Sequence, residues 1–148
     1  MSNEIESLLP HREPFLFVDE IVEVSNEKII TTHIFSENEF FFKGHFPEYP
    51  VVPGVVLVET MAQSGGAGLR KLGVLGDKSL FFLATVDKVK FRRQVRPNDK
   101  VRCEVENLRV SPSMIKQRGK AYVGDELAAE AEWMCLVSRE QGAISNEQ

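Results

Sequence analysis

The pattern of apolar and polar positions along the chain predicts six strands and one long helix. Stretches rich in β-branched and aromatic residues, typical of strands, cover residues 15–24, 28–35, 80–91, 101–106, 114–123 and 126–138. Residues 101–106 alternate strictly between apolar and charged side chains, as in a strand with one buried face. Short turns separate the last three stretches, so we expect them to form an antiparallel meander.

The long helix is expected to begin at Pro53, which suits a first helical turn, and to end near Leu72, where Gly73 can cap it. Its first turn is apolar on every side, which indicates a buried helix. Several of its residues are small enough to let another backbone pack closely against it: Ala62, Gly65, Gly66, Ala67 and Gly68. The simplest architecture for this order of elements is an α+β fold in which an antiparallel sheet wraps one central helix.

The composition is that of one globular domain. The chain has 148 residues, of which 43% are hydrophobic and 27% charged. It has no apolar run of the ~18 residues needed to cross a membrane and no apolar signal region. Its two cysteines are too few for a disulfide framework. We therefore expect a single soluble, cytoplasmic domain over residues 1–148, with a flexible polar tail from about 140 to 148.

The charges are unevenly distributed. The net charge of −4 argues against a dedicated nucleic-acid-binding protein. Residues 88–120, however, hold eleven lysines and arginines against three acidic residues, a local charge of +8. Such a basic segment can steer an acidic partner towards the protein. Alternatively, these residues are simply the outward-facing side chains of half-solvated strands.

His45 is the first candidate for chemistry. It lies in an apolar stretch that ends in Gly44-His45-Phe46-Pro47, where the surroundings favour the neutral imidazole that a general base requires. The alternative is a packed histidine that only satisfies its hydrogen bonds. His11 and His33 have no reactive residue beside them in the sequence. The three histidines lack the spacing of metal ligands, so we expect no metal site.

Glu59 is the second candidate. In an apolar helical turn a carboxyl group tends to keep its proton and can act as an acid. Glu59, Gln63, Gly66 and Arg70 share one face of the predicted helix. That stripe either faces solvent or lines a polar slot inside the protein, and spacing alone does not separate the two. Gln63 either orients Glu59 by a hydrogen bond or only fills the stripe.

The start of the helix is the third element. Gly54 and Val55 carry backbone N–H groups with no partner within the helix, at its positive end. A carbonyl oxygen that gains negative charge would be stabilised there. A base, an acid and an anion hole so close in sequence suit removal of a proton next to a carbonyl, coupled to protonation of a leaving group.

Several motifs resemble those of the FabZ-type (3R)-hydroxyacyl-[acyl-carrier-protein] dehydratases. The resemblance runs in unbroken order over about residues 5–138. It is carried by Leu9-Pro10-His11-Arg12, Pro14-Phe15-Leu16-Phe17-Val18-Asp19, Gly44-His45-Phe46-Pro47, Pro50-Val51-Val52-Pro53-Gly54-Val55 and Glu59-Thr60-Met61-Ala62-Gln63. It implies the hotdog fold, a long central helix wrapped by a curved antiparallel sheet.

The resemblance also implies an activity and its residues. In the family the histidine and the helical glutamate are catalytic, which corresponds to His45 and Glu59, and each site takes one of them from each subunit of a dimer. Dimers and trimers of dimers are the usual assemblies. The substrate arrives on the phosphopantetheine of an acidic acyl carrier protein, and no other cofactor is needed. We expect the acyl tunnel to be lined by Phe41, Phe46, Phe81 and Phe82. Docking of the carrier is assigned to Lys88, Lys90, Arg92, Arg93, Arg96, Lys100 and Arg102.

Three other functions compete with this one. A dehydratase that also isomerises the double bond would carry Asp where this chain has Glu59. A hotdog thioesterase would need an activated water, and the histidine–glutamate pair does not fit its usual motifs. A non-catalytic acyl-binding subunit would need neither His45 nor Glu59.

Overall fold

A computed structural model describes residues 2–76 and 79–138. The tail expected from about 140 to 148 lies outside these residues. Six antiparallel strands form one sheet in the order β1-β2-β4-β5-β6-β3. Their bounds are Glu20–Val24 for β1, Lys28–Ile34 for β2, Phe81–Phe91 for β3, Lys100–Val110 for β4, Met114–Val123 for β5 and Glu126–Val137 for β6.

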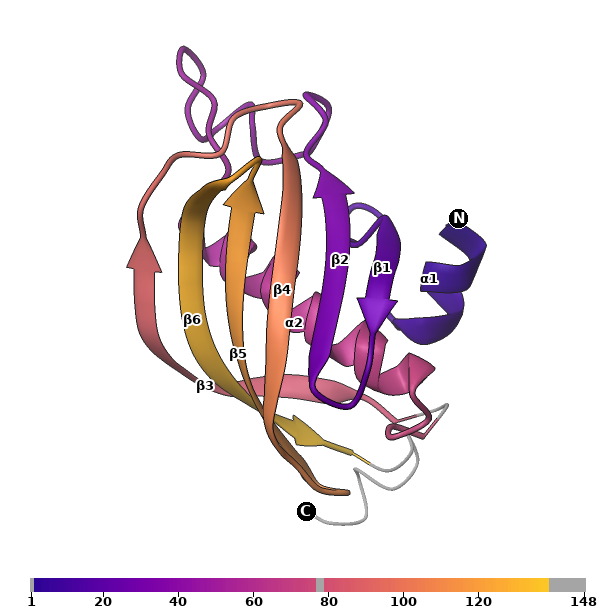
Figure 1. Cartoon of the computed structure of the whole chain (residues 1–148). Coiled ribbons are helices and arrows are strands. Elements are labelled where there is room, and N and C mark those ends of the chain that lie inside the picture. Colours follow the sequence, from indigo (N-terminus) through magenta and orange to yellow (C-terminus); the bar gives the residue numbers. More distant parts are fainter. Residues whose placement is uncertain (1, 77–78, 139–148) are drawn as a thin grey trace.

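The long helix α2 (Gly54–Lys71) lies across one face of the sheet and contacts all six strands (Figure 1). Its fourteen buried positions include glycines, serine and glutamine as well as aliphatic residues, so packing rather than helix propensity holds it in place. The α+β architecture and the meander β4-β5-β6 predicted from the sequence are both confirmed. A short helix, α1 (Ser2–Leu8), was not predicted.

One predicted strand is shorter than expected. Residues 15–24 were predicted as a single strand, but β1 begins only at Glu20. The buried residues Leu16, Phe17 and Val18 run beside α2 instead. The N–H of Phe17 and the carbonyl of Phe15 bond to the side chain of Gln63 rather than to a neighbouring strand, so this segment does not join the sheet.

We expected another backbone to pack closely against the small residues of α2. In the structure, side chains from the sheet pack against its glycines instead. A Cβ atom added at Gly65 would overlap the side chain of Gln117, and one added at Gly66 would overlap the ring of Phe81. At Gly68 it would lie 2.6 Å from three carbons of Ile29, which is fully buried. These glycines therefore determine how closely the sheet approaches the helix.

This packing predicts the effect of Gly68→Ala. Alanine favours the helix by about 1 kcal/mol, but overpacking a filled core costs about 1–3 kcal/mol. Because Ile29 has no free space to move into, we expect a net loss in the free energy of unfolding, measured by urea titration. Gly44→Ala is the matched control, since nothing lies within 4 Å of a Cβ there. Equal stability of both variants would contradict the packing argument.

Candidate active site

His45 lies in the segment between β2 and α2, and its ring is half-buried rather than enclosed by the apolar residues around it. It stacks on the exposed ring of Phe46, with 4.3 Å between the ring centroids. Its Nδ1 is 3.1 Å from the carbonyl oxygen of Val51. A carbonyl oxygen can only accept a hydrogen bond, so Nδ1 carries the hydrogen and Nε2 is left with a free lone pair. This is the tautomer that a proton acceptor needs.

The beginning of α2 leaves two amides free. Pro53 is the N-cap residue, and its carbonyl accepts from the N–H groups of Val56 and Leu57. Among the described residues no acceptor contacts the N–H of Gly54 or of Val55. The helix start therefore presents two unpaired donors at its positive end.

A groove of about 510 Å³ opens beside these amides. The ring of Phe91, a residue that the sequence did not single out, covers Gly54 so closely that a Cβ there would lie 2.7 Å from it. No local signal marks Phe91, because only the pairing of β3 brings it to the helix start. The groove is lined by Val51, Val52, Gly54, Val55, Leu57, Phe91, Arg92, Arg93, Gln94 and Val95.

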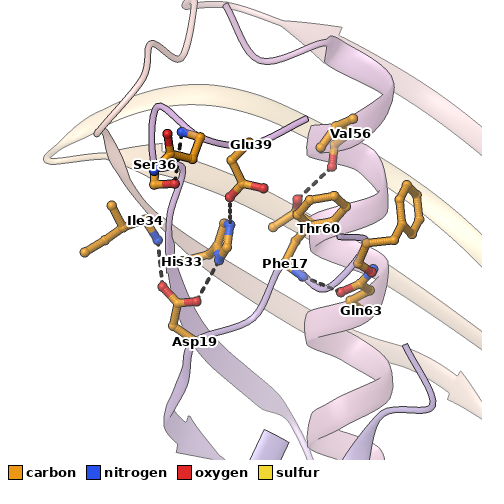
Figure 2. A network of polar contacts seen from close by, with 11 residues as sticks. Phe17, Asp19, His33, Ile34, Ser36, Glu39, Val56, Thr60 and Gln63 are labelled. Atoms are coloured by element: carbon orange, nitrogen blue, oxygen red, sulfur yellow. Dashed lines mark hydrogen bonds and ion pairs between the residues drawn. The ribbon is translucent and has the colours of Figure 1, made fainter. Parts of the chain in front are cut away.

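The polar stripe of α2 faces the interior of the protein. Gln63 is fully buried, Gly66 and Arg70 are buried, and the side chain of Glu59 is only 20% exposed. The stripe thus lines a polar slot, and the alternative that it faces solvent is wrong. The Gln63 amide donates to Glu59 Oε2 (3.0 Å) and to the carbonyl of Phe15 (3.1 Å). Its oxygen accepts from the N–H of Phe17 at 2.8 Å (Figure 2).

His11 contradicts the expectation that it has no reactive neighbour. Its Nε2 is 3.5 Å from Glu59 Oε2, and its ring lies 5.9 Å from that of Phe81. Its Nδ1 is buried, with no hydrogen-bond partner among the described residues. His11 lies far from Glu59 in the sequence, so only the folded chain reveals their proximity.

His33 also has partners that the sequence did not predict (Figure 2). Its Nδ1 is 2.8 Å from Asp19 Oδ1, and its Nε2 is 2.9 Å from Glu39 Oε2. Burial alone would lower the pKa of His33, but hydrogen bonds to these two carboxylates outweigh it and raise the pKa to about 9. The charged ring therefore joins β2 to the segment before β1 and to the loop that leads towards His45.

The four candidate tunnel residues lie in different surroundings. Phe41 is buried in an aromatic cluster with Phe17 and Phe35. Phe46 and Phe82 are about half exposed, and Phe81 is partly buried between α2 and His11. The structure thus brings Phe81, but not Phe41, next to Glu59 and its partners.

Four of the seven basic residues assigned to docking form ion pairs with glutamates, three of them with glutamates of β6 and one with a glutamate of its own strand, β4. Arg96 instead lies over the ring of Tyr49, 4.0 Å from its centroid. Among the described residues neither Lys90 nor Lys100 has an ion-pair partner within 4 Å. Because of these ion pairs, the surface formed by the basic segment 88–120 carries less positive charge than the count of its lysines and arginines indicates. The pairs are Lys88–Glu132, Arg92–Glu130, Arg93–Glu126 and Arg102–Glu104.

His45 and Glu59 are not in contact through any polar interaction in the described part of the chain. That part also contains no cluster of His, Cys, Asp or Glu that is suited to a metal ion. None of its helices is long and apolar enough to cross a membrane.

Comparison with known proteins shows the family to which this chain belongs. The model of the FabA-like domain matches residues 9–132. A 3-hydroxyacyl-[acyl-carrier-protein] dehydratase FabZ from Pelotomaculum thermopropionicum is 48% identical over 136 residues, which cover 91% of this chain and 96% of that protein. One from Desulforamulus reducens is 45% identical over 138 residues, covering 93% and 96%. The resemblance seen in the sequence motifs is thus confirmed.

Solved structures show the same fold at lower identity. The dehydratase heterocomplex ApeI:P from Xenorhabdus doucetiae superposes with a TM-score of 0.80 at 16% identity, over 97% of both chains. A thioesterase from Haemophilus influenzae gives a TM-score of 0.58 at 15% identity, over 82% of this chain and 79% of that one. The expected hotdog fold is confirmed.

The His33 network predicts a pH dependence of stability. The pKa of about 9 in the folded protein lies above the ordinary value of 6.5, so the stabilisation is complete below pH 6.5 and is lost as the pH rises towards 9. We expect the free energy of unfolding to fall by about 3 kcal/mol over this range. His33→Gln should flatten that slope in urea titrations.

The measurement should stop at about pH 9. Burial raises the pKa of the thiols of Cys103 and Cys135 from 9.0 to about 12, so these thiols lower the stability from about pH 9 upwards, and they do so equally in both proteins. An identical slope in the parent protein and in His33→Gln would show that His33 does not carry the effect.

Proposed function

Because this chain belongs to the FabZ-type dehydratases of the FabA-like family, we propose that it removes water from (3R)-hydroxyacyl-[acyl-carrier-protein]. The product is trans-2-enoyl-[acyl-carrier-protein], an intermediate of cytoplasmic fatty-acid synthesis. The enzyme is a hydro-lyase and uses no cofactor beyond the phosphopantetheine that carries the substrate. Two observations support the proposal: the His45 ring is held through its Nδ1 by the carbonyl of Val51, and the Glu59 carboxyl group is held by Gln63 in a buried polar slot.

The chemistry follows from what each group can do. Nε2 of His45 takes a proton from C2 of the acyl chain, while the N–H groups of Gly54 and Val55 bind the thioester oxygen as it gains negative charge. Glu59 donates its proton to the C3 hydroxyl, which leaves as water. The proton now on His45 returns to Glu59, so the cycle neither gains nor loses a proton.

The half-site at His45 and the half-site at Glu59 are completed by a second copy of the chain. β3 is an edge strand, and Phe82 and Phe91 on it are more than 50% exposed, as is Val55 at the start of α2. A long, apolar, unpaired edge is a surface that proteins normally cover. Pairing of β3 with β3 of a partner would cover it and bring His45 of one subunit towards Glu59 of the other. Trimers of such dimers remain a prediction.

The carrier protein and the acyl chain would use the groove at the helix start. Arg92 and Arg93 lie on its wall beside the free amides, where a phosphopantetheine arm would enter. Their ion pairs with glutamates are partly exposed and therefore worth little to folding, so an acidic carrier can compete for them. Lys88, Lys90, Arg96, Lys100 and Arg102 would extend the docking surface, and Phe46, Phe81 and Phe82 the tunnel.

His45→Ala and Glu59→Ala should each lower kcat by about 10²–10⁴-fold, because each removes one partner of the acid–base pair. The assay is turnover of a 3-hydroxyacyl thioester with the double bond located in the product. A conjugated enoyl product supports the proposal, and a shifted double bond indicates an isomerising enzyme. Release of free thiol indicates a thioesterase, and an unchanged substrate indicates a binding subunit.

Mixing the two inactive variants tests whether each site spans two subunits. In a dimer of one His45→Ala and one Glu59→Ala chain, one of the two sites keeps both groups. Random mixing makes half of the dimers mixed, so we expect about a quarter of the parental activity after joint unfolding and refolding. The control is each variant refolded alone. A mixture as inactive as its components would place both groups in one subunit.

A further inference from the structure

We propose that His11 is a positioning residue that determines which oxygen of Glu59 carries the catalytic proton. This inference rests on the proposed dehydratase activity and adds a residue to its site. It starts from the observation that two side-chain nitrogen atoms lie near the same oxygen of the carboxyl group. Gln63 Nε2 is 3.0 Å from Glu59 Oε2, and His11 Nε2 is 3.5 Å from the same atom.

A protonated carboxyl group has one O–H and one oxygen that only accepts. The Gln63 amide nitrogen is a donor here, because the oxygen of the same amide accepts from the N–H of Phe17. A donor at Oε2 makes Oε2 the accepting oxygen and places the proton on Oε1. A second donor from His11 strengthens that preference. Among the described residues no hydrogen-bond partner contacts Oε1, so its O–H is free to meet the C3 hydroxyl.

The surroundings of His11 determine its tautomer. Nε2 faces a carboxyl oxygen, whereas Nδ1 is buried without a partner in the described part of the chain. A buried N–H without an acceptor costs more than a bare nitrogen in the same place, so the hydrogen lies on Nε2. The distance of 3.5 Å is long for a hydrogen bond, and such contacts in active sites commonly shorten when substrate binds.

Arg12 holds the backbone of His11 in place. Its guanidinium donates to the carbonyls of Glu6, in α1, and of Leu9 and His11, just after it. On the other side the His11 ring rests beside the ring of Phe81, which fills the space left by Gly66. The imidazole is thus supported by α1, β3 and α2 together.

Two substitutions distinguish the hydrogen bond donated by His11 Nε2 from the mere presence of a polar side chain at this position. In His11→Gln the amide nitrogen can occupy the position of Nε2 and still donate to Glu59. In His11→Asn the shorter side chain places its amide near Nδ1, out of reach of Oε2. Both variants keep a polar side chain and neither can titrate.

We expect His11→Asn to lower kcat by about 10–100-fold, the equivalent of one hydrogen bond to a charged group. KM should change by less than about threefold, since His11 acts on the acid and not on substrate binding. His11→Gln should retain kcat within about fivefold of the parent. Equal kcat values for the two variants, or a change confined to KM, would overturn the proposal.

A measurement on the unaltered protein keeps the proposal falsifiable if either variant folds poorly. The ¹⁵N spectrum of histidine-labelled protein, with His11 assigned by its loss in His11→Gln, should show the hydrogen on Nε2. A hydrogen on Nδ1 would overturn the proposal. A parent enzyme that leaves the 3-hydroxyacyl thioester unchanged would instead overturn the proposed function, so the two failures are distinguishable.

Discussion

The side chain of Gln63 is the interaction on which the rest of the site depends. It is fully buried, and a buried amide is stable only when its oxygen and both of its hydrogens are paired. The N–H of Phe17, the carbonyl of Phe15 and the carboxyl group of Glu59 provide those partners. One side chain therefore joins the central helix, the extended segment before β1 and the acid. None of the three can shift without leaving a polar atom unpaired inside the protein.

His33 similarly joins separate segments on the side of His45, but through a charged ring rather than a neutral amide. Asp19 accepts from both its ring and the N–H of Ile34, and Glu39 holds the opposite ring nitrogen (Figure 2). Burial tends to raise the pKa of Asp19, but the hydrogen bond and charge of His33 outweigh it and lower that pKa. The loop towards His45 is thereby tied to the sheet, so His45 and Glu59, the base and the acid of our proposal, rest on separate buried polar networks.

Much of this could be predicted from the sequence, and the limits have physical causes. The helix from Gly54 and the meander from Lys100 were predictable because periodicity is local. His45 and Glu59 were singled out by their apolar surroundings and by family motifs. The direction of the Glu59–Gln63 stripe was not predictable, because a helix shows which residues share a face but not what covers that face.

The partners of the other two histidines were not predictable either. His11 meets Glu59 only after distant parts of the chain have packed. Asp19 and Glu39 lie 14 and 6 residues from His33, but only the path of the chain around β2 turns both carboxyl groups onto one ring. Phe15–Val18 has the composition of a strand, yet its backbone bonds to a buried side chain. In each case tertiary contacts outweigh the local pattern.

The close packing of Gly66 against Phe81 has an evolutionary consequence. The ring occupies the volume that any larger residue at position 66 would need, and its far side supports His11. Substitutions at these two positions are therefore epistatic: a bulkier residue at one is tolerated only after the other has become smaller. Such a compensated exchange would also move the imidazole of His11, which lies beside Glu59. If these residues act as we propose, neutral substitutions in the hydrophobic interior are coupled here to selection on turnover.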